Sequence, residues 1–268
     1  MRTVLVTGAS SGIGSACAER LARSGWRVLA GVRREGDAPE GTEELLLDVT
    51  DAAQIEAAAA RVEELQGLVN NAGIALAAPL EFVPLEELRK QLEVNVLGQV
   101  AVTQAFLPAL RRGRGRIVFI GSVAGKSALP FLGPYAASKH AIEAIADSLR
   151  VELSPWGIGV TVVEPGTIKT PIWTRSASRA DELLETMDGR DRLEALYGER
   201  IARFRQIALA RGQAGASPES VAEAVEEALT ASRPRTRRLV GRDARIRAGV
   251  ELLPDRLRDR VYERVLTR

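Results

Sequence analysis

The stretch "TGASSGIG" at residues 7–14 decides the fold. It follows the largely β-branched run "TVLV" (3–6) and opens a segment of helical character that extends from about Gly12 to Ser24. Glycines at positions 8, 12 and 14 permit a tight turn and let the backbone approach a pyrophosphate, which the N-terminus of the following helix attracts. The alternative is a glycine-rich turn without a ligand, but the strand–turn–helix context favours a dinucleotide-binding site.

Outside this stretch, short apolar runs alternate with helical segments, which is typical of βαβ units and a parallel sheet. Further strands are predicted at 27–32, 44–49, 67–73, 115–122, 157–166 and 237–241, and helices at 51–65, 84–111, 134–153 and 217–231. The predicted fold class is α/β: one Rossmann domain over residues 1–268, a doubly wound parallel sheet of about seven strands with helices on both faces. Residues 171–215 contain helical runs without a strand, and we interpret them as a helical lid insertion.

Composition narrows the class of protein. The chain has 268 residues, of which 46% are hydrophobic, and this suits a soluble globular domain. No run of about 18 apolar residues occurs, and the predicted first strand follows Met1-Arg2 directly, so neither a membrane span nor a signal peptide is expected. A single cysteine, Cys17, and a single histidine, His140, argue against an internal disulfide and a zinc site. We therefore expect a cytoplasmic protein in which Cys17 is a core residue.

Five elements, in order, resemble the short-chain dehydrogenases/reductases. They are "TGASSGIG" (7–14), "NNAG" (70–73), Asn95 in "LEVNVLG", Ser122 in "IGSVAG" with "YAASK" (135–139), and "PGTIKT" (165–170). The resemblance covers residues 3–170. The longer stretches that begin "SVAGKSALP" and "RRLVGRDA" are most similar to the hydroxysteroid and retinol dehydrogenase-like branch of that family.

The resemblance implies a proton-transfer site. Tyr135 is implied as the general acid/base, Ser122 as the group that holds the substrate carbonyl oxygen, and Asn95 as the holder of a water that links Lys139 to solvent. A free tyrosine has a pKa of about 10, and we expect the positive charge of Lys139, one helical turn away, to lower it. Lys139 is also implied to bind the nicotinamide ribose. Because the tyrosine and serine polarise the carbonyl, no metal is expected.

The implied cofactor is NADP(H), with NAD(H) as an alternative. The second predicted strand ends in Val32, where an NAD site would offer a carboxylate to the ribose, and Arg33 follows, which can pair with a 2′-phosphate. Many NADP-using relatives carry a further basic residue just before the middle glycine, and here that position is Ser11. Asp48 could reach the adenine amino group or cap a turn. The cofactor positions expected besides Tyr135 and Lys139 are Gly8, Ser10, Ser11, Gly12, Ile13, Gly14, Arg33, Asp48, Val49, Asn71, Ala72, Gly73, Pro165, Gly166, Ile168 and Thr170.

Two features admit other interpretations. His140 suggests a Ser-His-Asp hydrolase, but "GSVAG" is not the G-x-S-x-G nucleophile motif. The C-terminal segment 243–268 places apolar residues at three- and four-residue steps among arginines, from Ile246 through Val250, Leu253, Leu257 and Val261 to Val265. We interpret this amphipathic stripe as packing on the protein's own body or on a partner subunit, in preference to a membrane surface. Interleaved acids and the absence of a recognition motif argue against nucleic-acid binding.

The leading hypothesis is an NADP(H)-dependent enzyme that interconverts a ketone and a secondary alcohol. The alternatives are a 3-oxoacyl-thioester reductase and a non-catalytic dinucleotide-binding sensor or scaffold. A bulky apolar substrate, such as a steroid, retinoid or polyketide, is expected from the apolar residues of the lid. These are Trp173, Leu183, Leu184, Met187, Leu196, Tyr197, Ile201 and Phe204. Family members commonly pair through the helices predicted at 84–111 and 134–153, so a homodimer or homotetramer is expected.

Overall fold

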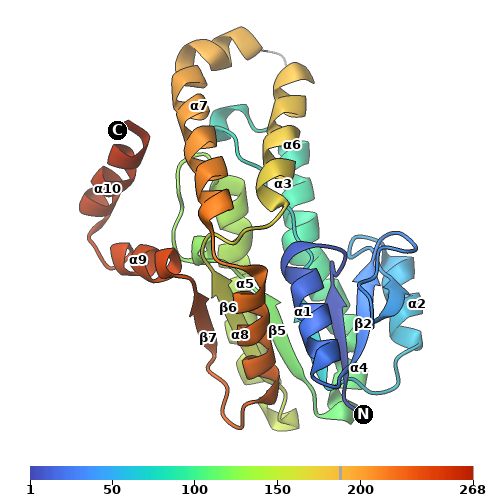
Figure 1. Ribbon diagram of the computed structural model, residues 1–268. Coiled ribbons are helices and arrows are strands. Elements are labelled where there is room, and N and C mark those ends of the chain that lie inside the picture. Colours follow the sequence, from blue (N-terminus) through green and yellow to red (C-terminus); the bar gives the residue numbers. More distant parts are fainter. Residues whose placement is uncertain (187–188, 268) are drawn as a thin grey trace.

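A parallel sheet forms the centre of the molecule (Figure 1). The computed structural model describes residues 1–186 and 189–267. Within them, seven strands are ordered β3-β2-β1-β4-β5-β6-β7, and all neighbours are parallel. Their bounds are β1 Thr3–Thr7, β2 Arg27–Val32, β3 Glu43–Leu46, β4 Gly67–Asn70, β5 Arg116–Ile120, β6 Gly159–Pro165 and β7 Arg237–Val240. The predicted doubly wound α/β sheet is confirmed.

Helices cover both faces of the sheet, so the strands are apolar on both sides. Val4 and Val6 of β1 pack with α1 (Gly12–Arg23) and α8 (Pro218–Thr230), while the intervening Leu5 packs with α2 (Ala52–Ala60), α4 (Gly98–Gly113) and α5 (Gly133–Glu152). This alternation follows from the two-residue period of a strand. Cys17 of α1 is fully buried, which confirms it as a core residue.

The chain adds strands first on one side of β1 and then, from β4 onward, on the other side. Strands β2 and β3 lie on one side of β1, and β4 through β7 lie on the other. The loops that follow β1 and β4 therefore diverge at the carboxyl ends of adjacent strands, which leaves the crevice where ligands bind in open α/β sheets.

The helix predicted over 84–111 is interrupted. It consists of α3 (Leu85–Leu92), a π-helical turn (Glu93–Leu97) and α4. Such turns insert an extra residue and are frequent at functional sites. Here the turn contains Asn95, whose side chain binds the backbone of Ile74 in the loop after β4. Short 3₁₀ turns occur at Leu80–Phe82, Val123–Gly125 and Ser154–Trp156.

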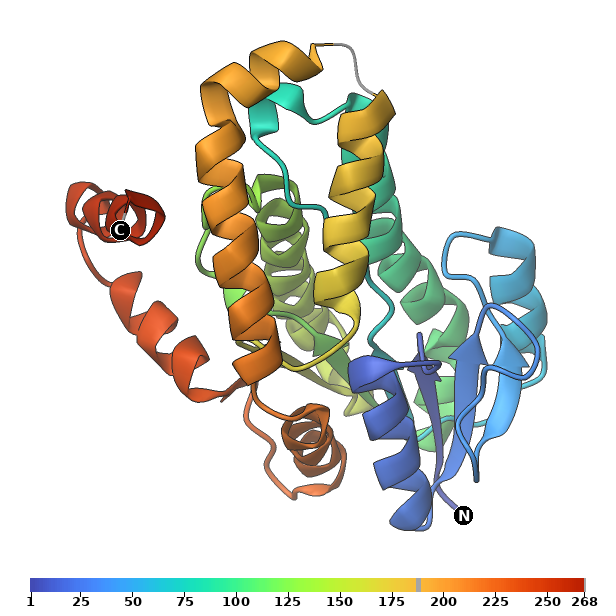
Figure 2. The same cartoon turned by 45° about the horizontal axis from the view of Figure 1, so that its top comes forward.

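The lid is a pair of helices that project beyond the carboxyl edge of the sheet (Figure 2). They are α6 (Ile172–Thr186) and α7 (Arg190–Ala214). At the base, Ile168 pairs with Ala216, and the indole of Trp173 donates to the Ile168 carbonyl at 2.8 Å. The described residues of 171–215 thus form helices and no named strand, and their assignment as a substrate-lid insertion stays a prediction.

The apolar residues of the lid have different environments. Phe204 and Tyr197 contact the ring of Phe131 edge-on, with centroid separations of 5.5 and 6.3 Å. Phe131 has a φ of 67°, an uncommon value for a bulky residue, so the loop before α5 is shaped to meet the lid. Leu196, by contrast, is exposed. The side chain of Leu184 and residue Met187 lie outside the described residues.

The C-terminal segment forms two helices, α9 (Arg242–Val250) and α10 (Asp255–Thr267), in place of one continuous apolar stripe. Pro254 lies between the two helices. Proline has no backbone N–H and its ring clashes with the preceding turn, so a helix cannot continue through it. Ile246 and Leu257 are exposed, whereas Ala244 and Tyr262 are buried. Ile246 and Leu257 therefore do not pack on the protein's own body. Packing of the stripe on a partner subunit stays a prediction, and the side chain of Val265 lies outside the described part.

No helix among residues 1–186 and 189–267 is both long and apolar enough to cross a lipid bilayer.

Candidate active site

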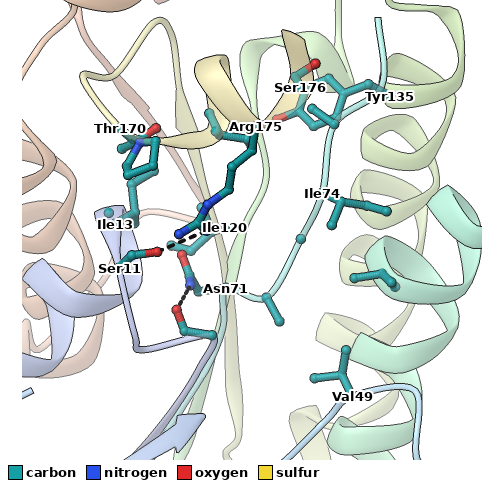
Figure 3. Close-up of a pocket in the computed structure, with 18 of the residues that line it drawn as sticks. Ser11, Ile13, Val49, Asn71, Ile74, Ile120, Tyr135, Thr170, Arg175 and Ser176 are labelled. Atoms are coloured by element: carbon teal, nitrogen blue, oxygen red, sulfur yellow. Dashed lines mark hydrogen bonds between the residues drawn. The ribbon is translucent and has the colours of Figure 1, made fainter. Parts of the chain in front are cut away.

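A cavity of about 980 Å³ lies at the crevice between the loops after β1 and β4 (Figure 3). It unites residues from eight separate stretches of sequence. Of the positions predicted to contact the cofactor, all but Gly14 line this cavity, together with Ser122, Tyr135 and Lys139. Asn95 is not part of the lining. The cavity is therefore the common site that the sequence motifs predict.

The glycine-rich loop has the backbone geometry of a phosphate cradle. Gly8 and Gly12 adopt φ values of 64° and 62°, which disfavour residues with a side chain. Ser11, the N-cap of α1, makes no side-chain capping bond to the described residues, and the first turn carries no acid. The first amides of α1 are thus free to receive an anion. These residues fit the diphosphate of a dinucleotide.

Gly14 has a packing role. A Cβ on this residue would lie 2.2 Å from the carbonyl oxygen of Gly8 and 2.5 Å from Nδ2 of Asn71. Only glycine lets α1 approach the loop so closely. Gly14 is not part of the cavity lining, and its contact with the cofactor stays a prediction.

The NNAG segment joins the loops after β1 and β4. Asn71 Nδ2 donates to the carbonyl oxygen of Thr7 at 2.8 Å. In return, the Thr7 hydroxyl accepts from the backbone amides of Asn71 and Ala72 at 2.9 and 3.0 Å. These bonds tie the floor of the cavity together, so Asn71 holds the cradle as well as lining it.

At the end of the cavity where the cofactor's adenosine is expected, a basic residue follows an apolar strand end. Val32 and Arg33 both line the cavity, and Arg33 is exposed and free to move onto a phosphate. Arg34 pairs with Asp37 at 3.0 Å. Asp48 caps its own turn, because Oδ1 accepts from the Thr50 amide and hydroxyl at 2.9 and 2.8 Å. The turn-cap interpretation of Asp48 is therefore confirmed, and its contact with the adenine amino group stays a prediction.

Arg175 is a cavity residue that the sequence motifs did not indicate. It extends from α6 across the cavity, and Nη1 donates to Ser11 Oγ at 3.3 Å (Figure 3). Ser11 occupies the position where many NADP-using relatives have a basic side chain. A residue of the lid thus places a positive charge at the same point. Nothing in the local sequence could reveal this, because the contact spans 164 residues.

Ser122, Tyr135 and Lys139 meet at the other end of the cavity. Ser122 follows β5 and caps a 3₁₀ turn by accepting from the Ala124 amide at 3.1 Å. Lys139 is buried one turn after Tyr135 on α5, and its Nζ donates to the carbonyl oxygen of Ile120 at 2.7 Å. Nζ lies 5.8 Å from the centroid of the Tyr135 ring. The expected constellation is therefore assembled on two adjacent elements.

Burial dominates the electrostatics of this pair. It raises the pKa of Tyr135 above its ordinary value, against smaller lowering effects from Ser122 and from the charge of Arg247. It also lowers the pKa of Lys139 to about 8, against a smaller raising effect of Glu143. The expected lowering of the Tyr135 pKa by Lys139 is absent from this structure. The reason is that desolvation penalises both charged forms, and the ammonium points at Ile120.

Asn95 connects two walls of the site. Its Oδ1 accepts from the Ile74 amide at 2.8 Å, and its Nδ2 donates to the Ile74 carbonyl at 2.9 Å and to Ser138 Oγ at 3.0 Å. Ser138 in turn donates to the carbonyl of Tyr135 at 2.7 Å. The side chain therefore holds the loop after β4 against α5. Its role in retaining a water stays a prediction.

His140 lies outside the cavity. It is exposed on α5, and its Nδ1 is 2.8 Å from the carbonyl oxygen of Ala136. It has no position in the Ser122–Tyr135–Lys139 group, which agrees with rejecting a hydrolase.

The model of a known family, described as short chain dehydrogenase, matches residues 2–181. This chain belongs to the short-chain dehydrogenases. Members of this family are NAD(P)-dependent oxidoreductases that act on CH–OH groups, so the chain is an enzyme of that class.

Full-length relatives support the assignment. The chain is 37% identical to an NADPH-dependent 3-dehydrocapnine reductase of Ornithobacterium rhinotracheale, covering 98% of this chain and 96% of the relative. It is 39% identical to human retinol dehydrogenase 16, covering 91% and 81%. A short-chain dehydrogenase of Burkholderia cenocepacia, solved with NADP, superposes with a TM-score of 0.75 at 27% identity, over the full length of both chains.

A second, smaller cavity of this short-chain dehydrogenase adjoins the first at Ser122 and Tyr135. Its volume is about 120 Å³, and the lid supplies most of its walls. The lid residues Trp173, Ile201 and Phe204 line it, so part of the apolar content noted in the sequence does face the catalytic side chains.

Burial of the charged Lys139 should lower the free energy of unfolding of this short-chain dehydrogenase. The shift of its pKa from 10.5 to about 8 corresponds to roughly 3 kcal/mol against folding at pH 7. Loss of its hydrogen bond to Ile120 would offset about 1 kcal/mol. We therefore expect Lys139→Met to raise the free energy of unfolding by about 2 kcal/mol at pH 7 while activity is lost.

The stability penalty from Lys139 should depend on pH. Because the folded pKa is below the unfolded one, the penalty is complete below about pH 8 and disappears as the pH rises toward 10.5. The advantage of the variant should shrink over that interval, as measured by urea unfolding at a series of pH values. A variant less stable than wild type at pH 7 would contradict this.

Proposed function

We propose that the protein interconverts ketones and secondary alcohols with NADP(H), and that its substrates are predominantly apolar. The observation that carries the proposal is the meeting of two cavities at Ser122 and Tyr135, one with a phosphate cradle and one with lid walls. A nicotinamide cofactor, when bound, supplies the hydride. The relatives named as an NADPH-dependent reductase and as solved with NADP support the choice of NADP(H).

In this mechanism, the hydroxyls of Tyr135 and Ser122 orient and polarise the substrate carbonyl. Tyr135 donates its proton to the oxygen during reduction and accepts it during oxidation. The Lys139 ammonium donates to the Ile120 carbonyl in this structure, so it would turn toward the cavity to stabilise the phenolate and to bind the nicotinamide ribose. Its pKa of about 8 leaves it mostly charged at neutral pH.

The adenosine end selects the cofactor through charge. Arg33 is placed to pair with a 2′-phosphate, and Val32 presents no carboxylate against it. Arg175 adds positive charge at Ser11, beside the N-terminus of α1. Together these residues favour the cofactor with the larger negative charge.

The lid cavity favours an apolar substrate. As it stands, its volume of about 120 Å³ is below the roughly 300–1,000 Å³ of typical ligand pockets, so α6 and α7 must move away from the region of α3 to admit a bulky molecule. Ion pairs between the lid and the region of α3 would break in that motion, such as Arg179–Glu87 and Arg192–Glu81.

Self-association also belongs to this proposal. The outer faces of α4 and α5 are long enough for an isologous contact, and Leu97 and Val151 are exposed beside them. A homodimer or homotetramer is the assembly we propose.

A homologous series of methyl ketones tests the proposal. We expect kcat/KM with NADPH to rise about fourfold per added methylene from 2-butanone to 2-octanone, because each buried methylene contributes about 0.8 kcal/mol. The panel should include a 3-oxoacyl thioester and small hydrophilic carbonyls. A flat series, or turnover of only the hydrophilic compounds, would contradict an apolar substrate. Cofactor binding without oxidation by any carbonyl would favour the sensor hypothesis.

A further inference from the structure

The lid cavity contains a guanidinium that forms no ion pair with a described carboxylate. Three charged side chains line this cavity: Asp181, Arg205 and Arg247. Asp181 and Arg205 form a two-point ion pair with N–O distances of 2.6 and 2.7 Å, so they neutralise each other. Arg247 makes no ion pair with any described residue. Its charge is therefore the net charge of the cavity wall.

The guanidinium of Arg247 has one hydrogen-bond partner and one unpartnered N–H group among the described residues. It lies on α9, and its Nη2 donates to Ser127 Oγ at 2.6 Å. Its Nε is buried and has no hydrogen-bond partner among the described residues. The nearby carboxylate of Asp243 accepts from the Thr167 amide at 2.6 Å. Burial lowers the pKa of Arg247, against smaller raising effects from Tyr262, Asp243 and Tyr135.

A partly buried guanidinium with an unpartnered Nε and no ion pair is costly unless an anion completes it. The surrounding groups determine where such an anion would lie. Ser122, Tyr135 and Arg247 line the same small cavity, and the charge of Arg247 acts on the Tyr135 hydroxyl. The anion would therefore lie close to the reacting carbonyl. The remaining walls, which include Phe204 and Leu209, are largely apolar.

We propose that the substrate carries an oxyacid anion near its reacting carbon, with an apolar remainder between α6 and α7, and that Arg247 binds this anion. Carboxylate, sulfonate and phosphate share the planar or forked oxygen geometry that a guanidinium recognises. This inference rests on the proposed ketone–alcohol function and names its substrate class. Arg247 would then determine specificity while Tyr135 and Ser122 act on the carbonyl.

Binding to the enzyme–NADPH complex tests the inference without turnover, because an alcohol cannot react with the reduced cofactor. The probes are 2-hydroxy-4-phenylbutanoate and its amide, which are nearly isosteric and differ in charge. By titration calorimetry, we expect the carboxylate to bind wild type at least tenfold more tightly than the amide. Arg247→Met should reduce this ratio to about one, and Arg247→Lys should retain part of it.

Arg245→Met is the matched control, because Arg245 is exposed on the same helix. It should keep the wild-type ratio, and thermal melts should show that each variant is folded. Equal binding of the two probes by wild type, no measurable binding of the carboxylate, or an unchanged ratio in Arg247→Met would each overturn the inference. The ketone panel is read separately, so turnover without an anion preference overturns the anion site alone. An Arg247-dependent preference without turnover overturns the reaction alone.

Discussion

Tyr135→Phe lowers kcat by about 10²–10⁴-fold or more while the dissociation constant for NADPH stays within about twofold of wild type. The substitution removes only the hydroxyl that transfers the proton, and the ring keeps its place between Ser122 and Lys139. The cradle around Ser11 and the basic residues at the adenosine end are untouched. Single-turnover reduction of 2-octanone and fluorescence titration with NADPH measure the two quantities.

The control for this substitution is Tyr197→Phe. Tyr197 lies on the lid, outside both cavities, and its hydroxyl interacts with Glu81 at 3.0 Å. Turnover in this variant should remain within about twofold of wild type. If Tyr135→Phe retained half of the wild-type activity, Tyr135 would not be the general acid.

The preference for NADPH over NADH, expressed as a ratio of kcat/KM values, falls by about 10²–10³-fold in Val32→Asp. A carboxylate at the end of β2 would lie beside the 2′-phosphate, and like charges about 4 Å apart repel by up to about 4 kcal/mol at an effective dielectric constant of about 20. Arg33→Ala removes an attraction of about 1.5–3 kcal/mol and should lower the ratio about ten- to a hundredfold.

Val32→Thr tests whether the effect of Val32→Asp comes from the charge of the aspartate or from its polarity. Val32 is only 1% exposed, so an aspartate also costs stability, and threonine has nearly the same shape without a charge. The threonine variant should keep most of the NADPH preference. Wild-type use of both cofactors at equal efficiency, unchanged in Arg33→Ala, would show that Arg33 does not select the cofactor.

Most of the candidate site could be predicted because its residues belong to local motifs at fixed places in a regular fold. Parallel strands end at one edge of a sheet, so motifs that follow β1, β4, β5 and β6 must meet there. Tyr135 and Lys139 lie one helical turn apart, which brings them to the same face of α5. The motif does not specify which neighbour Gly14 approaches, and the structure shows that this neighbour is the carbonyl oxygen of Gly8.

The alternation of apolar runs with helical segments also determined the α/β class of the fold. This alternation depends on residues a few positions apart, where backbone geometry fixes which side chains meet. Arg175 at Ser11 and Arg247 at the lid cavity were decided only by the tertiary structure. In a chain so rich in arginine, sequence spacing does not distinguish a solvated guanidinium from one brought to a site by α6 or α9. The packing of those helices against the sheet makes that distinction, because it alone determines which charges lose their water.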